Sequence, residues 1–303
     1  LLRLWGQHWD KSSRYGISIV TSTANPSQPI ARSTVEQSYQ QIFTDLNSAL
    51  SLLNTDNGNA YISISAAKAL LARVYLYHQD FDEAAAMASE VIDNGAFELF
   101  GAEDFTKIYT EKLTAESVFE LKFEQANPSS YNAITYLRDD ALRVDVIFLA
   151  NTDLNTFFEN RPGDNRAGLV DFINNDLSIE PDGRSQKYRG ETAKDNSAYI
   201  IRLAEMYLIR AEAMSRTEGL EDLNAIRVSR GLPELTDEDV PDDESYINAI
   251  LDERRAEFNF EGQRLYDLAR TGKVEEILGA GVKEIMPIPQ REIAATNGVV
   301  EQN

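Results

Sequence analysis

The chain has 303 residues, of which 43% are hydrophobic and 26% charged, the mixture of an ordinary globular protein with a large core. Fifty acidic against 29 basic side chains give a net charge of −21, which disfavours binding to nucleic acids and to anionic membrane surfaces. The absence of cysteine excludes disulfides, thiolate metal sites and cysteine nucleophiles. No run approaches the roughly 18 apolar residues of a membrane span, and no signal peptide is recognisable, so we expect a mature chain or a fragment.

Residues 32–54 predict the first long helix. Apolar side chains recur there at three- and four-residue steps, so one stripe faces a core. Ser33 precedes this stripe and Glu36 follows three residues later, which is the pattern of a capping box. We therefore expect an amphipathic helix with Ser33 as its N-cap.

Two further helices form a predicted hairpin. The first covers residues 65–79 with Ser65 as its N-cap, and the second covers 81–94 with Asp80 and Glu83 as acidic capping residues. Small and large side chains alternate between the two helices with the spacing of a degenerate tetratricopeptide repeat. This pattern favours pairs of antiparallel helices that stack on one another.

Short strands are expected between the helices. In residues 117–123, Phe119 and Leu121 fall on one face and Glu120 on the other, so we predict a half-buried strand with its apolar face inward. Residues 15–20 show a weaker strand pattern.

Helical patterns return as a hairpin over residues 200–231 and a helix over 244–260. The chain therefore predicts a mainly α fold, a single domain built as an arc of tetratricopeptide-like hairpins with a few short strands. The helical frame is expected to cover about 1–124 and 198–290, and residues 291–303 form a C-terminal tail.

Residues 125–197 lack helical periodicity and are rich in turn formers. About 70 residues without a long helix exceed ordinary loop lengths, so we predict a functional insertion. Aromatic rings in it can stack on the flat C–H faces of sugars while polar side chains bond the hydroxyls; alternatively, the rings only pin the insertion to the frame. The candidate ligand contacts are Tyr131, Tyr136, Asp139, Arg143 and Tyr188.

Residues 250–272 thread four arginines and five acids through a helical pattern. An arginine on an apolar stripe needs partners, because an unpaired buried charge is highly unfavourable. We therefore predict a structural lock between neighbouring hairpins. The expected partners are, for Arg254, Glu257 or Glu261 on the same helix or Glu205 or Glu212 on a neighbour, and for Arg264, Asp267.

The competing interpretation is a catalytic pair of carboxylates for glycosidic cleavage, such as Glu257 and Glu261. Because each acid has an arginine within one helical turn, its pKa should be lowered, and no enzyme activity is expected. His8 and His78, the only histidines, lack a carboxylate at metal-ligand spacing. No phosphate-binding loop, dinucleotide or nucleophile-elbow motif is present, so neither a metal nor a cofactor is predicted.

Four stretches together resemble a known family. They read ERRAEFNFEGQRLYDLARTGK at 253–273, IIRLAEMYLIRAEAMSR followed by LNAIRVSRGLP after residue 200, IMPIPQREIAATNGVVEQN at 285–303 and LLRLWGQHW at 1–9. They are similar to motifs of the SusD/RagB family, the surface glycan-binding lipoproteins of Bacteroidota, and they occur in the family's order. The lipidated cysteine and the further residues that precede the LLRLWG-like segment in that family are not in this sequence.

The resemblance implies a right-handed arc of tetratricopeptide-like hairpins with a less regular ligand-binding half. It also implies non-catalytic capture of a nutrient, an oligosaccharide or in some relatives a peptide, at the surface of the outer membrane. The implied partner is a TonB-dependent, SusC-like transporter, and a lipid anchor is the only implied contact with the membrane. The alternatives are a plain helical-repeat scaffold that binds a protein and, as a third interpretation, a glycoside hydrolase.

Overall fold

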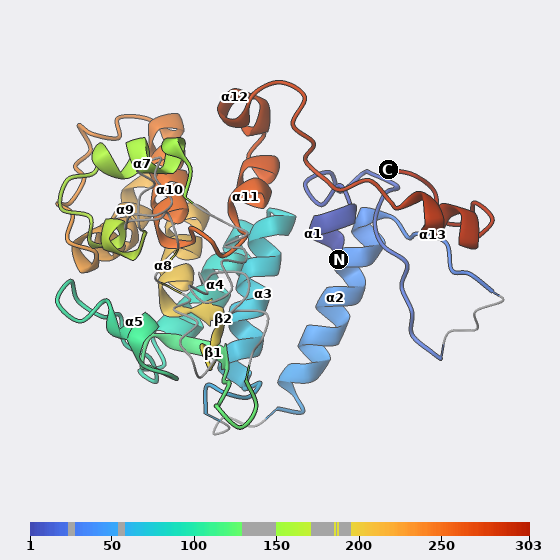
Figure 1. The fold of residues 1–303 in the computed structure, drawn as a ribbon, viewed down its shortest axis with the longest axis horizontal. Coiled ribbons are helices and arrows are strands. Elements are labelled where there is room, and N and C mark those ends of the chain that lie inside the picture. The colour runs from blue at the N-terminus through green and yellow to red at the C-terminus, as the bar shows by residue number, and fades with distance from the viewer. Residues whose placement is uncertain (24–27, 54–57, 129–149, 171–184, 186, 188–194) are drawn as a thin grey trace, which may run out of the picture.

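The computed structural model describes residues 1–303 except 24–27, 54–57, 129–149, 171–184, 186 and 188–194. Within the described residues helices dominate and two short strands accompany them, which confirms the predicted mainly α fold (Figure 1). The longer helices are α2 (Val35–Leu50), α3 (Ile64–His78), α4 (Phe81–Ile92), α8 (Leu203–Ala213), α9 (Arg216–Ser229) and α10 (Asp243–Glu257). The shorter ones are α1 (Leu2–Trp5), α5 (Lys107–Thr110), α7 (Thr152–Glu159), the 3-10 helix η1 (Asn165–Leu169), α11 (Arg264–Arg270), α12 (Val274–Leu278) and α13 (Gln290–Ala295). In this part of the chain, no helix combines the length and the apolar character needed to cross a membrane.

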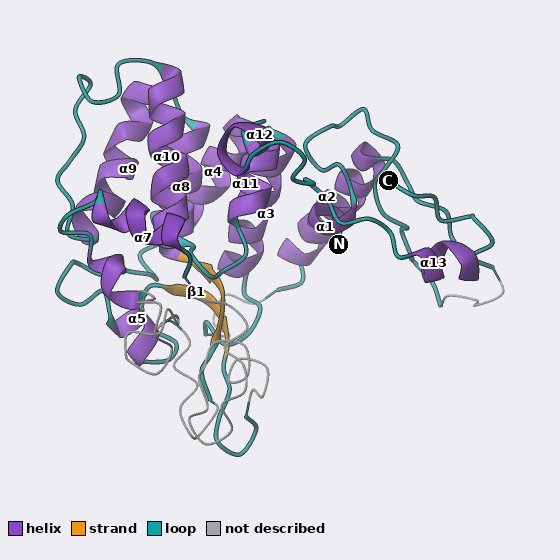
Figure 2. Cartoon of the chain, turned by 45° about the horizontal axis from the view of Figure 1, so that its top comes forward, coloured by secondary structure: helices purple, strands orange, loops and turns teal. Residues whose placement is uncertain are grey.

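Two helical hairpins stand next to each other at the centre of the molecule. The chain turns from α3 into α4 at Gln79, which has a left-handed backbone with φ 64°, and α4 packs against α8, which pairs with α9 (Figure 1). Ala72, Ala84 and Ala88 are completely buried in the core that these helices share. Their small side chains let the helix axes approach closely, as the alternation of small and large residues predicted. Both chain termini lie near α1 and α2, on the side of the molecule away from α9 (Figure 2).

Gly219 allows α9 to lie against α8. A Cβ atom at this position would come within 2.3 Å of both the Ala211 carbonyl oxygen and the Tyr246 hydroxyl. The Tyr246 hydroxyl donates a hydrogen bond of 2.8 Å to the same Ala211 carbonyl, so α8, α9 and α10 meet at this point. Any larger side chain at residue 219 would force these helices apart.

The N-caps of the first two long helices differ from the predicted ones. Thr34, not Ser33, caps α2, and it forms a capping box with Gln37 instead of Glu36. Ser63 caps α3, because its hydroxyl accepts a bond from the Ala66 amide. In both cases two candidate capping residues stand close together, Ser33 and Thr34 at the start of α2 and Ser63 and Ser65 at the start of α3, and the sequence alone does not choose between them. Asp80 does occupy the N-cap position of α4, but its side chain makes no capping bond.

Strands β1 (Ser117–Leu121) and β2 (Ala198–Arg202) form an antiparallel pair. The first was predicted in the right place with the wrong face inward, since Glu120 is buried and Leu121 is 43% exposed. The pairing shifts register on both sides of Phe119, and such an irregularity breaks strict alternation. β2 was assigned to the start of a helix, and residues 15–20 form no strand.

The chain reverses direction between α10 and α11. α10 begins at a capping box of Asp242 and Ser245 and ends at Glu257, three residues earlier than predicted. Phe260 and Gly262 follow with φ values of 60° and 72°, so Gly262 lies in the turn after the helix and does not itself end the helix as had been expected. The sharp turn folds α11 back beside α10 (Figure 1).

The predicted insertion, 125–197, is described in part. It contains α7 and η1, and 129–149, 171–184, 186 and 188–194 within it lie outside the described residues. The division into frame, insertion and tail therefore stays a prediction.

Candidate functional site

Buried charged side chains surround Glu257 at the C-terminal end of α10. Arg166 Nη1 and Arg230 Nε each lie 3.1 Å from Glu257 Oε2, and Arg202 Nη1 lies 2.5 Å from Oε1. All four side chains are almost completely shielded from solvent. Arg230 also donates a bond of 2.5 Å to Glu116. These contacts join segments that are far apart in the sequence.

Each arginine comes from the end of a different element. Arg166 lies in η1, Arg202 is the last residue of β2, and Arg230 is the C-cap of α9. Arg202 Nη2 and Lys187 Nζ also donate to the Glu257 carbonyl oxygen, at 3.1 and 2.7 Å. Cations suit this place because the last carbonyls of a helix have no intrahelical donors and carry partial negative charge.

Glu253, one turn earlier on α10, extends the network. Its carboxylate accepts from Arg161 at 2.6 Å, from Arg227 at 3.3 Å and also from Arg166. Asp164 accepts from Arg166 at 2.8 Å and from Arg161 at 2.9 Å. Acidic and basic groups therefore alternate through the cluster, and each buried charge has an opposite neighbour.

The environment separates the pKa values of the two central carboxyls. Burial raises the pKa of Glu257, but the guanidinium groups of Arg230, Arg202 and Arg166 outweigh it and hold this pKa well below its usual value. For Glu116 burial prevails, and its pKa is raised in spite of Arg230. Burial also lowers the pKa of Lys187 to about 8. Carboxyls with divergent pKa values are typical of acid–base pairs in hydrolases.

Access argues against such a role for this pair. Both carboxylates have no exposed surface, and both oxygens of Glu257 are bonded to arginine. A sugar could reach them only if several buried ion pairs separated first. The geometry around Glu257 is therefore that of a structural lock between the helical hairpins and the segment that carries η1.

Arg254 takes a partner that was not predicted. Its Nε donates to Asp267 Oδ2 at 2.8 Å, instead of pairing with Glu257, Glu261, Glu205 or Glu212. The turn at Gly262 places Asp267 of α11 beside Arg254, so the guanidinium pairs across the turn and not with a carboxylate on α10. Asp267 also accepts from Arg270 at 2.9 Å.

The neighbouring carboxylates have other partners. Arg270 holds Glu212, with Nη2 at 2.8 Å, and Arg73 holds Glu205 with two bonds of 2.6 Å. The expected pair of Arg264 with Asp267 is also wrong, because Arg264 Nη1 donates instead to the Leu251 carbonyl oxygen at 3.0 Å. Proximity in sequence misled these predictions, since the true contacts depend on the turn between the helices.

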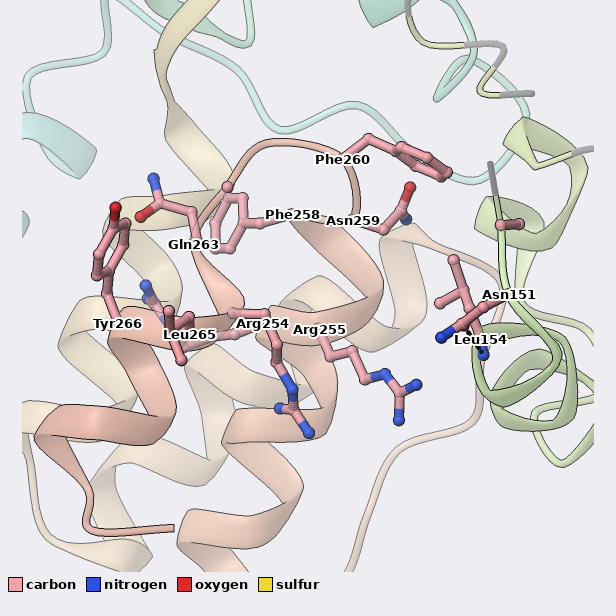
Figure 3. A pocket seen from close by; sticks show the side chains of 13 residues that line it. Asn151, Leu154, Arg254, Arg255, Phe258, Asn259, Phe260, Gln263, Leu265 and Tyr266 are labelled. Carbon is pink, nitrogen blue, oxygen red and sulfur yellow. Dashed lines mark hydrogen bonds between the residues drawn. The ribbon is translucent and has the colours of Figure 1, made fainter. Parts of the chain in front are cut away.

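A cavity of about 490 Å³ lies between the start of α7 and the corner that joins α10 to α11 (Figure 3). This volume is within the range of small-molecule sites, roughly 300–1,000 Å³. In Figure 3, Asn151 and Leu154 face the cavity from the α7 side. The opposite side carries three arginines and three aromatic rings, namely Arg254, Arg255, Arg264, Phe258, Phe260 and Tyr266.

The predicted ligand contacts Tyr131, Tyr136, Asp139, Arg143 and Tyr188 lie outside the described residues, and their roles stay predictions. Two other rings of the same segment are described. Phe158 is buried in a small core, and Phe157 packs under the Arg255 guanidinium at 4.4 Å from the ring centre. These two rings hold the segment in place, which is the alternative role considered for the aromatic residues.

The two histidines have separate structural environments. His8 is completely buried among Trp9, Tyr77 and Tyr266, and burial lowers its pKa to about 4. His78 lies between the carboxylates of Glu36 and Asp80. Within the described residues, no cluster of histidine and acidic side chains is arranged to hold a metal ion.

Sequence reasoning missed most of the lock. Arg202 and Arg230 lie in the stretches that resemble the SusD/RagB family, each beside an apolar run, and that position was a usable signal. Arg166, Lys187 and Glu116 stand in polar or mixed segments, where nothing distinguishes them from solvated charges.

Two protein-family models match the chain. The SusD family matches residues 181–283, and a family described as starch-binding and associating with the outer membrane matches residues 1–76. SusD-like protein P2 of Formosa agariphila is 26% identical over 346 aligned residues, which cover 95% of this chain and 68% of that protein. Among the curated relatives that it matches, the chain spans between 23% and 68% of their length.

Solved structures with a similar fold align with this chain over nearly its whole length. A SusD superfamily protein from Bacteroides thetaiotaomicron VPI-5482 is 29% identical with a TM-score of 0.84, and the match covers 100% of this chain and 74% of that one. A laminarin-binding SusD-like protein is 26% identical with a TM-score of 0.74, over 95% of this chain and 73% of that one. The fold thus places the chain in the class of proteins that are built as a stack of SusD-type helical hairpins. The chain belongs to the SusD/RagB family, as its four sequence stretches predicted.

Proposed function

We propose that this chain belongs to a non-catalytic, surface-exposed lipoprotein that captures an oligosaccharide and delivers it to a TonB-dependent, SusC-like transporter of the outer membrane. The observation that carries the proposal is the likeness to a laminarin-binding SusD-like protein over 95% of this chain, at 26% identity. A matching family described as starch-binding and associating with the outer membrane supports the same function and location.

The structure supports capture without turnover. Glu257 and Glu116, two neighbouring carboxyls whose pKa values shift in opposite directions, are enclosed by arginines in the protein core. A glycosidase needs its two carboxyls on either side of an accessible sugar. We therefore expect reducing-end assays over a broad glycan panel to stay at background, and product release that is lost in Glu257→Gln would contradict the proposal.

Ligand contacts are proposed in the irregular segment 125–197. The apolar stripes of the long helices are already used in packing, as the buried alanines of α3 and α4 illustrate. Tyr131 and Tyr136 are the proposed stacking platforms, and Asp139 and Arg143 the proposed partners of sugar hydroxyls. Tyr188 is a further candidate from the same segment.

The test is an array of glycans and peptides probed with the purified chain, with laminarin and starch oligosaccharides included. Binding of at least one glycan, with no peptide bound, is expected. Binding of peptides alone would point to peptide capture, and silence across the array would favour a protein-binding scaffold. Co-purification of the full-length protein with a TonB-dependent transporter from outer membranes tests the partner.

A further inference from the structure

We propose that the cavity between α7 and the α10–α11 corner binds a negatively charged sugar residue, one that bears a carboxylate or a sulfate group. The inference rests on the proposed glycan capture and adds the chemical class of the glycan. It uses described residues alone and is independent of the tyrosines proposed above.

The positive charges on the cavity wall are unequally neutralised. Arg254 has a buried partner in Asp267 at 2.8 Å, yet its Nη1 and Nη2 atoms are buried without a hydrogen-bond partner among the described residues. Arg255 pairs with Asp153, whose side chain is 73% exposed. Arg264 has no carboxylate within 4.0 Å in the described part of the chain, and its Nη1 donates to the Leu251 carbonyl oxygen at 3.0 Å. The wall therefore retains positive charge.

The environment of Arg264 also indicates that positive charge at the cavity wall is incompletely neutralised. Its pKa is lowered first by burial and next by the neighbouring Arg255 cation, and these effects exceed those of Asp252, Asp267 and Asp153. A bound oxyanion would compensate this charge. Because the chain as a whole carries −21, general attraction of anions is excluded, and an anion would be drawn only to a local arrangement of this kind.

The rest of the wall suits a sugar ring better than a small inorganic anion. Phe258, Phe260 and Tyr266 contribute aromatic surface to the cavity. In Figure 3, Phe260 and Asn259 extend toward the α7 side. Asn259 Oδ1 is buried without a donor among the described residues, while its Nδ2 donates to the Ala256 carbonyl. Rings for C–H faces, an acceptor for a hydroxyl and guanidinium groups for an oxyanion together fit an acidic saccharide.

The backbone of Phe260 is a further sign of a special site. Its φ of 60° is uncommon for a bulky residue, and glycine would adopt it at lower cost. An aromatic residue held in a strained conformation on a cavity wall suggests that the ring itself is needed there.

Calorimetric titration with three oligosaccharides of matched length tests the inference: an oligogalacturonate, a sulfated galactan oligosaccharide and neutral laminarihexaose. We expect an acidic oligosaccharide to bind at least about tenfold more tightly than the neutral one. The two acidic probes distinguish a carboxylate from a sulfate. Arg264→Gln should weaken acidic binding about tenfold or more, Arg264→Lys should retain most of it, and Arg14→Gln should leave it unchanged. Arg14 is an exposed arginine outside the cavity, and its substitution changes the net charge equally.

A second variant guards against a folding defect in Arg264→Gln. Phe260→Gly relieves the left-handed backbone, which partly offsets the lost packing of the ring against the core around Phe158, so the variant should stay folded while acidic binding weakens. Equal affinity of wild type, Arg264→Gln and Phe260→Gly for an acidic oligosaccharide would overturn the inference. Binding of the neutral probe alone would also overturn the inference while leaving the proposed glycan capture intact. If no glycan of the array bound, the proposed function itself would be rejected.

Discussion

Arg254 Nε lies 2.8 Å from Asp267 Oδ2, and this contact joins α10 to α11 across the turn at Gly262. Both side chains are at most 2% exposed. Burial raises the pKa of Asp267, but Arg254 and Arg270 outweigh it and lower that pKa below its usual value. The pair is thus fully ionised at neutral pH, and its two charges depend on each other.

Arg254→Ala should lower the free energy of unfolding by about 3 kcal/mol. The substitution leaves the buried Asp267 carboxylate with Arg270 as its remaining arginine partner and removes the guanidinium that packs 5.1 Å from the Phe258 ring centre. Urea denaturation at pH 7 measures the change. Arg14→Ala, which breaks an exposed pair with Glu301, is the control and should leave stability nearly unchanged. Equal effects of the two substitutions would contradict the structural role of Arg254.

Glu257→Gln should be more damaging, at about 3–5 kcal/mol. The amide preserves the shape of the side chain but leaves Arg166, Arg202 and Arg230 facing one another in the core without the central negative charge. Since the pKa of Glu257 is held below its usual value of 4.5, its contribution should be present at neutral pH and fade as pH falls below that value. Denaturation at pH 7 is the measurement, with the exposed Glu103→Gln as the control. A Glu257→Gln protein as stable as that control would rule out the lock.

The helical part of the fold was predictable because it depends on local signals. Apolar periodicity and small-residue spacing located α2, α3 and α4, and Gly262 marked the turn that follows the charged helix. Cap positions were less certain, because neighbouring Ser and Thr residues compete, as at Ser33 and Thr34. β2 was missed because the apolar Ile200 and Ile201 run directly into the helical pattern of α8.

The lock was predictable in kind but not in its partners. A buried arginine needs a carboxylate, and this requirement was read correctly at Arg254. Which carboxylate it meets depends on the turn that places Asp267 beside it. Glu257 likewise pairs with Arg166, which is 91 residues away in the chain. Spacing along one helix carries no information about such contacts. The cavity at the same corner was not predicted for the same reason.

His8 should make the protein sensitive to mild acid. Its pKa is about 4 in the folded chain, because of burial and the nearby Arg3 and Arg270, against 6.5 as an ordinary value. Between these two values the unfolded chain binds a proton that the folded chain does not, so stability falls as pH is lowered from about 6.5 towards 4. Between pH 7 and 4.5 this loss should amount to roughly 2 to 3 kcal/mol.

The measurement compares urea denaturation of wild type and His8→Gln at both pH values. The variant cannot take up this proton, so its stability should change less with pH than that of the wild type. The carboxylates with lowered pKa values, such as Asp267, are present in both proteins, and their effect cancels in the comparison. Parallel pH dependence in the two proteins would show that His8 titrates normally in the folded chain.

Tyr131→Ala and Tyr136→Ala should each weaken binding of the glycan selected by the array by about 1 to 3 kcal/mol, which is about ten- to hundredfold in affinity. The reason is that a tyrosine ring at a sugar-binding surface offers its face to the C–H groups of the ligand, and alanine cannot replace this contact. A ring used in this way contributes little to the core, so the melting temperature should barely change. Calorimetric titration and thermal melting of each variant supply both quantities.

Tyr61→Ala is the matched control, because Tyr61 is 69% exposed and lies outside the segment 125–197. It should retain full affinity and melt as the wild type does. Full affinity in both Tyr131→Ala and Tyr136→Ala would move the stacking surface elsewhere, with Trp9 and Tyr188 as the next rings to substitute. A large drop in melting temperature together with lost affinity would instead assign the two rings to holding the segment in place, as Phe157 and Phe158 do.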